Sequence, residues 1–200
     1  MSSVRRLIGL DNYFNQIRIG KRVLKADNFP LGIDYERFTE IAEEISNEIP
    51  ADLKDFHDRL ENHVKVNKEN KIILSIDRLD YTKGILLRLK AFRLFLDKYP
   101  QFRGKVSLLL LITAQRDKDE QNRPIKSQLD AMVGKINSEY GHMGWTPIHY
   151  FLQELSFNEL VQVFLSSDVA LITPIRDGMN LIAKEYIASK PANDGVLIIS

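Results

Sequence analysis

The strongest constraint on the fold is an alternation of strand-like and helix-like segments that begins at Lys71. Residues 71–77 (KIILSID) form a short run rich in β-branched residues, which is typical of a buried strand. After Gly84, apolar residues recur at intervals of four, three and four, at Ile85, Leu89, Phe92 and Leu96. This spacing predicts one apolar face of a helix that follows the strand.

The alternation continues to the end of the chain. Further strands are predicted at residues 106–112, 147–151, 168–173 and 196–199. The helix after the second strand has Pro124 near its predicted first turn and an apolar face of Ile125, Leu129, Val133, Ile136 and Tyr140. Ser156 and Glu159 have the spacing of a capping box, and residues 181–189 predict a last helix. Five strands with four helices between them predict right-handed crossovers and a doubly wound parallel sheet of the α/β class.

The N-terminal third of the chain has a different pattern. Residues 1–33 contain short mixed segments, with a Pro-x-Gly turn predicted at Pro30 and Gly32. Residues 34–66 are rich in charge and predict one or two surface helices with a solvated face.

Composition excludes several classes of function. Lys and Arg number 28 against 27 Asp and Glu, and the net charge of +1 argues against binding nucleic acid or membranes through bulk charge. The chain has no cysteine, which excludes disulfides, a thiol nucleophile and a thiolate metal site. Its four histidines show no ligand spacing, so no metal is expected. Neither a signal peptide nor a membrane-spanning stretch is visible, and we expect a cytoplasmic protein.

The loops that follow the strands are the candidate sites, because an open parallel sheet binds ligands at the carboxyl ends of its strands. The first loop reads RLDYTKG, with Arg78 at the strand end and Lys83 just before the helix. Two cations beside a helix N-terminus favour an anion such as a phosphate. A solvated basic pair beside Asp77 and Asp80 is the alternative, and for this loop alone it is the more frequent arrangement.

A second informative loop spans residues 173–186 (TPIRDGMNLIAKEY). The candidate ligand contacts are its turn and first helical residues, namely Asp177, Gly178, Met179, Asn180 and Leu181. Free backbone N–H groups here can hold a phosphate or a sugar hydroxyl, and Gly178 permits close approach. Glu185 lies one helical turn after Leu181 on the same face, where a carboxylate can accept two ribose hydroxyls. The alternative is an ordinary Asp-Gly turn before a charged helix, which for this loop alone is at least as frequent as a ligand site.

Other polar residues are less specific. Arg116 follows the second strand among several acids, and it can either reach a second anionic ligand or remain a solvated loop residue. His149 lies within a predicted strand and is expected to be a core or edge histidine, and Trp145 is expected to pack.

Three motifs occur in order: RLDYTKG at residues 78–84, WTPIHYF at 145–151, and DVALITPIRDGMNLIAKEY at 168–186. Together they resemble the trehalose-6-phosphate synthases, retaining glycosyltransferases with the two-domain GT-B fold. FPLGID at residues 29–34 is similar to the segment that enters the donor domain of that family. The resemblance covers nearly the whole chain.

The resemblance implies an enzyme that transfers glucose from UDP-glucose to glucose 6-phosphate, with trehalose 6-phosphate and UDP as products. It implies that Arg78 and Lys83 are catalytic, because they would stabilise the diphosphate leaving group without a metal or other cofactor. Glu185 would hold the ribose. Asp177 and the amides after it would orient the donor glucose.

Two further roles follow from the resemblance. The backbone around Phe151 would hold the uracil, and Arg116 matches the position that contacts the acceptor phosphate. The resemblance also implies that residues 34–200 form the nucleotide-sugar domain, truncated at its C-terminus. Residues 1–33 would be a remnant of the acceptor domain and the connection between the two domains.

Because most of the acceptor domain is missing relative to that family, the activity of this fragment alone stays open. One alternative is a related sugar-phosphate synthase, such as a glucosylglycerol-phosphate synthase. Another is a non-catalytic regulatory subunit that associates with other trehalose synthase subunits. A generic nucleotide-binding module would bind adenine nucleotides as well as UDP, and a panel of nucleotides separates that case from the others.

Overall fold

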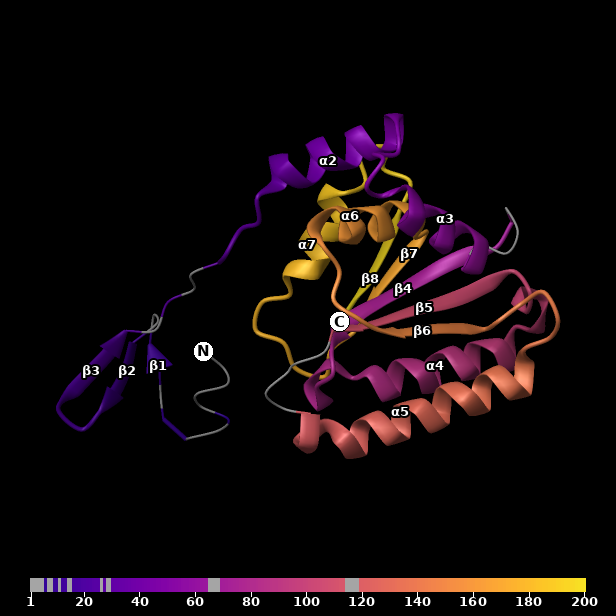
Figure 1. The fold of residues 1–200 in the computed structure, drawn as a ribbon. Coiled ribbons are helices and arrows are strands. Elements are labelled where there is room, and N and C mark those ends of the chain that lie inside the picture. The colour runs from indigo at the N-terminus through magenta and orange to yellow at the C-terminus, as the bar shows by residue number, and fades with distance from the viewer. Residues whose placement is uncertain are drawn as a thin grey trace. The chain divides into compact units, whose positions relative to one another are not determined.

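The computed structural model describes residues 6, 9–10, 12–13, 16–25, 27, 30–64, 69–113 and 119–200 (Figure 1). The chain divides into two compact units, residues 1–32 and 33–200. The first unit contains an antiparallel sheet of β1 (Asn12–Tyr13), β2 (Gln16–Ile19) and β3 (Arg22–Lys25). Gly20, with a φ of 60°, occupies the first position of the two-residue turn between β2 and β3, where a type II′ turn requires glycine.

The second unit is built on a parallel sheet of five strands. These are β4 (Lys71–Arg78), β5 (Val106–Thr113), β6 (Ile148–Leu152), β7 (Val169–Ile172) and β8 (Val196–Ile199). Their order in the sheet is β6-β5-β4-β7-β8, and each neighbouring pair is parallel. The predicted α/β fold with a doubly wound sheet is confirmed, and the strand order reverses between β4 and β7.

Helices cover both faces of this sheet (Figure 1). One face is covered by α4 (Ile85–Lys98) and α5 (Asp119–Tyr140), and the other by α6 (Phe157–Ser166) and α7 (Leu181–Ala188). Two single turns of 3₁₀ helix, η1 (Tyr81–Lys83) and η2 (Pro100–Phe102), flank α4. Strand β5 is apolar throughout because both of its faces are buried. Leu108 and Leu110 pack toward α4 and α5, whereas Leu109 and Leu111 pack in the core on the opposite face.

The surface helices predicted for residues 34–66 are confirmed, but the interpretation of this segment as a solvated face and nothing more is wrong. This segment forms α2 (Tyr35–Asn47) and α3 (Lys54–His63), and α2 packs against α6 and α7. Phe38, Ala42 and Ile45 of α2 are buried, and their spacing of four and three is that of a helix face. A narrow apolar stripe within a charged helix therefore supplies part of the main core.

Helix boundaries are confirmed at some positions and corrected at others. The capping box is present: Ser156 Oγ accepts from the Glu159 N–H, and Glu159 Oε2 accepts from the Ser156 N–H. Helix α5 begins at Asp119, so Pro124 lies in its second turn rather than its first. The turn predicted at Pro30 is wrong, because residues 30–34 are irregular and the start of α2 is instead capped by Asp34, whose side chain accepts from the Arg37 N–H.

Two aromatic predictions concern the edge of the sheet. Trp145 is buried and donates its Nε1–H to Ser107 Oγ at 3.0 Å, so it packs as expected. His149 lies on β6, an edge strand, where burial lowers its pKa. Within the residues that the structure describes, no helix is long and apolar enough to cross a bilayer.

Candidate active site

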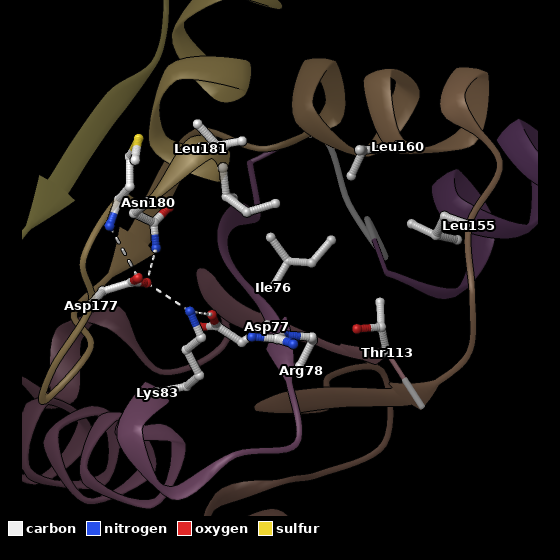
Figure 2. A pocket seen from close by; sticks show the side chains of 12 residues that line it. Ile76, Asp77, Arg78, Lys83, Thr113, Leu155, Leu160, Asp177, Asn180 and Leu181 are labelled. Atoms are coloured by element: carbon white, nitrogen blue, oxygen red, sulfur yellow. Dashed lines mark hydrogen bonds and ion pairs between the residues drawn. The ribbon is translucent and has the colours of Figure 1, made fainter. Parts of the chain in front are cut away.

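A cavity of about 310 Å³ lies at the carboxyl ends of β4 and β7, where the strand order of the sheet reverses (Figure 2). Residues 76–78 at the end of β4 line it, together with Lys83, Asp177 and the start of α7. Leu155, Leu160 and Thr113 complete its wall. In doubly wound sheets this crevice is the usual ligand site, and ligand cavities measure roughly 300–1,000 Å³.

The loop that carries Lys83 is shaped by local contacts. Asp80 accepts from the Thr82 N–H and from Thr82 Oγ, both at 2.8 Å, and these bonds lower its pKa. Gly84, with a φ of 68°, ends η1, and a Cβ added there would meet the Thr173 carbonyl oxygen at 3.0 Å. Asp80 therefore caps this turn. The short distance at Gly84 shows that the loop after β4 lies directly against the loop after β7.

Lys83 projects into the cavity, as Figure 2 shows. Its Nζ lies 2.6 Å from Asp177 Oδ2 and 3.9 Å from Asp77 Oδ1, and its side chain is only 14% exposed. The solvated basic pair considered from the sequence is thus wrong for Lys83. The fold instead brings together a cation and a carboxylate that lie 94 residues apart in the chain.

Asp177 joins Lys83 to the start of α7. Its carboxylate accepts from Asn180 Nδ2 at 3.0 Å and from the Met179 N–H at 3.4 Å. The hydrogen bond from Lys83 is the main reason why the pKa of Asp177 is lowered. Asn180 Oδ1 in turn accepts from the Ala183 N–H, so the positive end of the α7 dipole lies at the cavity.

Sequence reasoning missed Arg88, which lies behind this cavity on α4. It is buried, and its guanidinium donates to the carboxylate of Asp77 and to the Lys83 carbonyl oxygen. Its burial could have been predicted from its position in the sequence. Arg88 follows Ile85 by three residues and so lies on the apolar face of the helix.

The charged side chains that line the cavity balance, and a buried cation lies behind its wall. Arg78, at the exposed end of β4, also lines it. The cations Arg78 and Lys83 equal the lining carboxylates Asp77 and Asp177 in number. The buried Arg88 behind the wall adds one positive charge, and the helix N-terminus adds a partial one. Within the described part of the chain, no group of three or more His, Cys, Asp or Glu side chains could hold a metal ion. The arrangement is suited to a small anionic ligand.

Comparison with known proteins decides the family. The model of glycosyltransferase family 20 matches residues 1–200. This chain belongs to glycosyltransferase family 20. It is 37% identical over 204 residues to an α,α-trehalose-phosphate synthase (UDP-forming) of Dictyostelium discoideum, covering 100% of this chain and 26% of that protein.

Solved structures of the family agree with the fold. An α,α-trehalose-phosphate synthase (UDP-forming) from Burkholderia xenovorans, in complex with glucose 6-phosphate, superposes with a TM-score of 0.78 at 32% identity. An E. coli structure with UDP-2-fluoro glucose bound gives 0.79 at 34% identity. These matches cover 92% and 94% of this chain but only 38% and 40% of the chains compared. The chain therefore spans well under half the length of the three relatives named above.

Several of the site residues predicted from the sequence do not line the cavity. Glu185 is half-buried on α7, where burial raises its pKa, but it does not line the cavity. Gly178 lies in an adjoining hollow, which shares Asp177 and Asn180 with the cavity. Phe151 lines a separate cavity of about 180 Å³ against α3 and α6. Arg116 lies outside the described residues.

Proposed function

We propose that this chain provides the UDP-glucose side of a trehalose-6-phosphate synthase. Such an enzyme transfers glucose from UDP-glucose to glucose 6-phosphate and releases UDP and trehalose 6-phosphate. Family membership and the names of the relatives support this function. The observation that carries it is that Arg78, Lys83 and the N-terminus of α7 all border one cavity at the reversal of strand order.

The cations would act on the leaving group. Breaking the bond between glucose and the diphosphate leaves negative charge on the diphosphate, and preorganised donors that meet this charge lower the barrier. Lys83 is withdrawn from water, which strengthens its electrostatic effect. Its ammonium has three N–H groups, so it can donate to Asp177 and still donate to a phosphate oxygen. We propose that Arg78 and Lys83 do this without a metal or other cofactor.

The start of α7 would orient the donor. Backbone N–H groups at a helix N-terminus bind anions and hydroxyl oxygens, and Met179 and Leu181 lie at this end of the cavity. The Asp177 carboxylate can accept hydrogen bonds from hydroxyls of the glucose. A ribose contact at Glu185, a uracil contact near Phe151 and an acceptor-phosphate contact at Arg116 stay predictions, as does a cytoplasmic location.

The relatives favour this function over the alternatives. Those compared here carry the name of trehalose-phosphate synthases, one of them with glucose 6-phosphate bound and one with a UDP-sugar analogue. A regulatory subunit or a glucosylglycerol-phosphate synthase has no comparable support.

A calorimetric titration with UDP, UDP-glucose and ADP tests the proposal. We expect saturable binding of UDP and UDP-glucose, and a loss of at least about 1.5 kcal/mol in the Arg78→Ala/Lys83→Ala double variant, as for lost hydrogen bonds to charged groups. Equal affinity for ADP would indicate a generic nucleotide module instead. A folded chain that binds neither UDP nor UDP-glucose would contradict the proposal.

Transfer itself needs a second assay. UDP release from UDP-glucose should depend on added glucose 6-phosphate, and the double variant should lower it. Release that ignores glucose 6-phosphate but responds to another acceptor would point to a related sugar-phosphate synthase.

A further inference from the structure

Arg88 connects three segments that meet behind the cavity. It lies on α4 with 2% of its surface exposed. Its guanidinium donates to Ser75 Oγ and the Asp77 carboxylate on β4, to the carbonyl oxygen of Lys83, and to the Leu171 carbonyl oxygen on β7 at 3.4 Å. The two strands at the reversal point and the loop that carries Lys83 thus share one donor.

This pair of buried charges is not explained by stability. Asp77 is 3% exposed at its side chain, and its desolvation raises its pKa, which the guanidinium opposes. Taking two charges out of water costs about as much as their attraction returns, so an apolar pair of the same volume would hold the fold equally well. The pair is therefore weak evidence that Arg88 serves stability alone.

The surroundings of Lys83 indicate a further role. Its Nζ has two carboxylates within 4 Å, and both line the cavity: Asp177 at 2.6 Å and the buried Asp77, at the end of β4, at 3.9 Å. Arg88 already pairs with Asp77, so the ammonium pairs with Asp177 instead. Without the guanidinium, Asp77 would be a buried anion with Lys83 as its nearest cation. The ammonium would then turn from Asp177 to the buried Asp77 and would no longer be available to a ligand.

We propose that Arg88 is a positioning residue of the donor site: by pairing with Asp77 and holding the Lys83 backbone, it keeps the Lys83 ammonium available to the diphosphate of the donor. This inference rests on the function proposed above. Arg88 itself lies behind the cavity wall and acts through Lys83.

A comparison of UDP binding by four proteins tests the proposal. We expect the Arg88→Met variant to bind UDP at least about tenfold more weakly than the parent. The Asp77→Asn/Arg88→Met variant, in which no buried anion competes for Lys83, should recover most of that loss. Arg93→Met is the matched control: Arg93 lies on the same helix and pairs with Glu139 at 3.0 Å on the surface, and its loss should leave UDP binding unchanged.

Recovery of UDP binding in the double variant distinguishes a positioning role of Arg88 from a role in packing alone. If Arg88 only supports the fold, the double variant will bind UDP as weakly as Arg88→Met, and that result overturns the proposal. Parental affinity of a folded Arg88→Met variant overturns it as well. A parent that does not bind UDP at all refutes the proposed function instead, so the two failures are distinguishable.

Circular dichroism and thermal unfolding establish that each variant folds. If Arg88→Met does not fold, Arg88→Lys serves as the second test, because a lysine keeps the charge but cannot span the same acceptors. A folded Arg88→Lys variant should bind UDP about fivefold more weakly than the parent. Unchanged affinity of this variant would overturn the proposal.

Discussion

Replacement of Lys83 by methionine tests the proposed diphosphate site most directly. Methionine keeps much of the length of the side chain but removes the ammonium that lies 2.6 Å from Asp177. An exposed ion pair is worth at most about 1 kcal/mol, but a hydrogen bond to a charged group is worth about 1.5–3 kcal/mol. Since Lys83 is only 14% exposed, the larger value applies, and UDP should bind about 10- to 150-fold more weakly.

Calorimetric titration of UDP at low and at moderate ionic strength measures this effect. The Lys126→Met variant is the matched control, because Lys126 also pairs with an aspartate, Asp130, at 2.7 Å but lies on the surface of α5 at 42% exposure. Its UDP affinity should equal that of the parent. Thermal unfolding of the Lys83→Met variant should change little, since Asp177 keeps its bonds from Asn180 and Met179.

Two results would refute the reasoning. A folded Lys83→Met variant that binds UDP within about twofold of the parent would show that the ammonium does not contact the diphosphate. An equal loss in Lys126→Met would show that overall charge, and not the position of Lys83, governs binding.

Three further predictions concern stability. Ser156→Ala removes the cap of α6 and should lower the free energy of unfolding in urea by about 1 kcal/mol, and no change would contradict the capping box. Phe164→Ala empties a fully buried site where the Phe164 ring packs against the Tyr186 ring in a T-shaped arrangement, and it should cost about 3–5 kcal/mol in the same assay. A loss under about 1 kcal/mol would show that the site collapses. Because the folded protein lowers the pKa of Asp177, the stability that this carboxylate contributes is present above the ordinary pKa of aspartate and is lost as the pH falls through the lowered value. Asp177→Asn should therefore unfold with a weaker dependence on acid pH, and an unchanged dependence would contradict this.

Local patterns were sufficient to predict the architecture. The helix face of Ile85, Leu89, Phe92 and Leu96 is buried as its spacing predicts, and β8 has the predicted bounds. For α2 the helix itself was predicted but its share of the core was missed. Its three buried apolar residues lie among many charges, and only the packing of α2 on α6 and α7 shows that they are core. Periodicity reports what a segment can bury, but the partner that buries it lies elsewhere in the chain.

The candidate site was predicted only in part. Arg78, Lys83 and Asp177 were selected because their loops follow strands, and all three line the same cavity. The alternative interpretation of the first loop treated Asp77 and Asp80 alike as ion-pair partners, but Asp80 caps a turn while Asp77 pairs with Arg88. The role of each aspartate depends on which donors surround its carboxylate in the folded chain. The residues adjacent to it in the sequence do not determine those donors.

The amino-acid sequence by itself determined the alternation of strands and helices, the parallel sheet and the loops that meet at its carboxyl edge, because hydrophobic period and turn residues act over a few positions. Only the tertiary structure decided that Lys83 faces Asp177 and that Arg88 neutralises Asp77. Such pairings depend on burial and on distances between segments far apart in the chain. Electrostatic energy at this site is therefore a property of the folded chain, set by how closely β4, β7 and α4 approach one another.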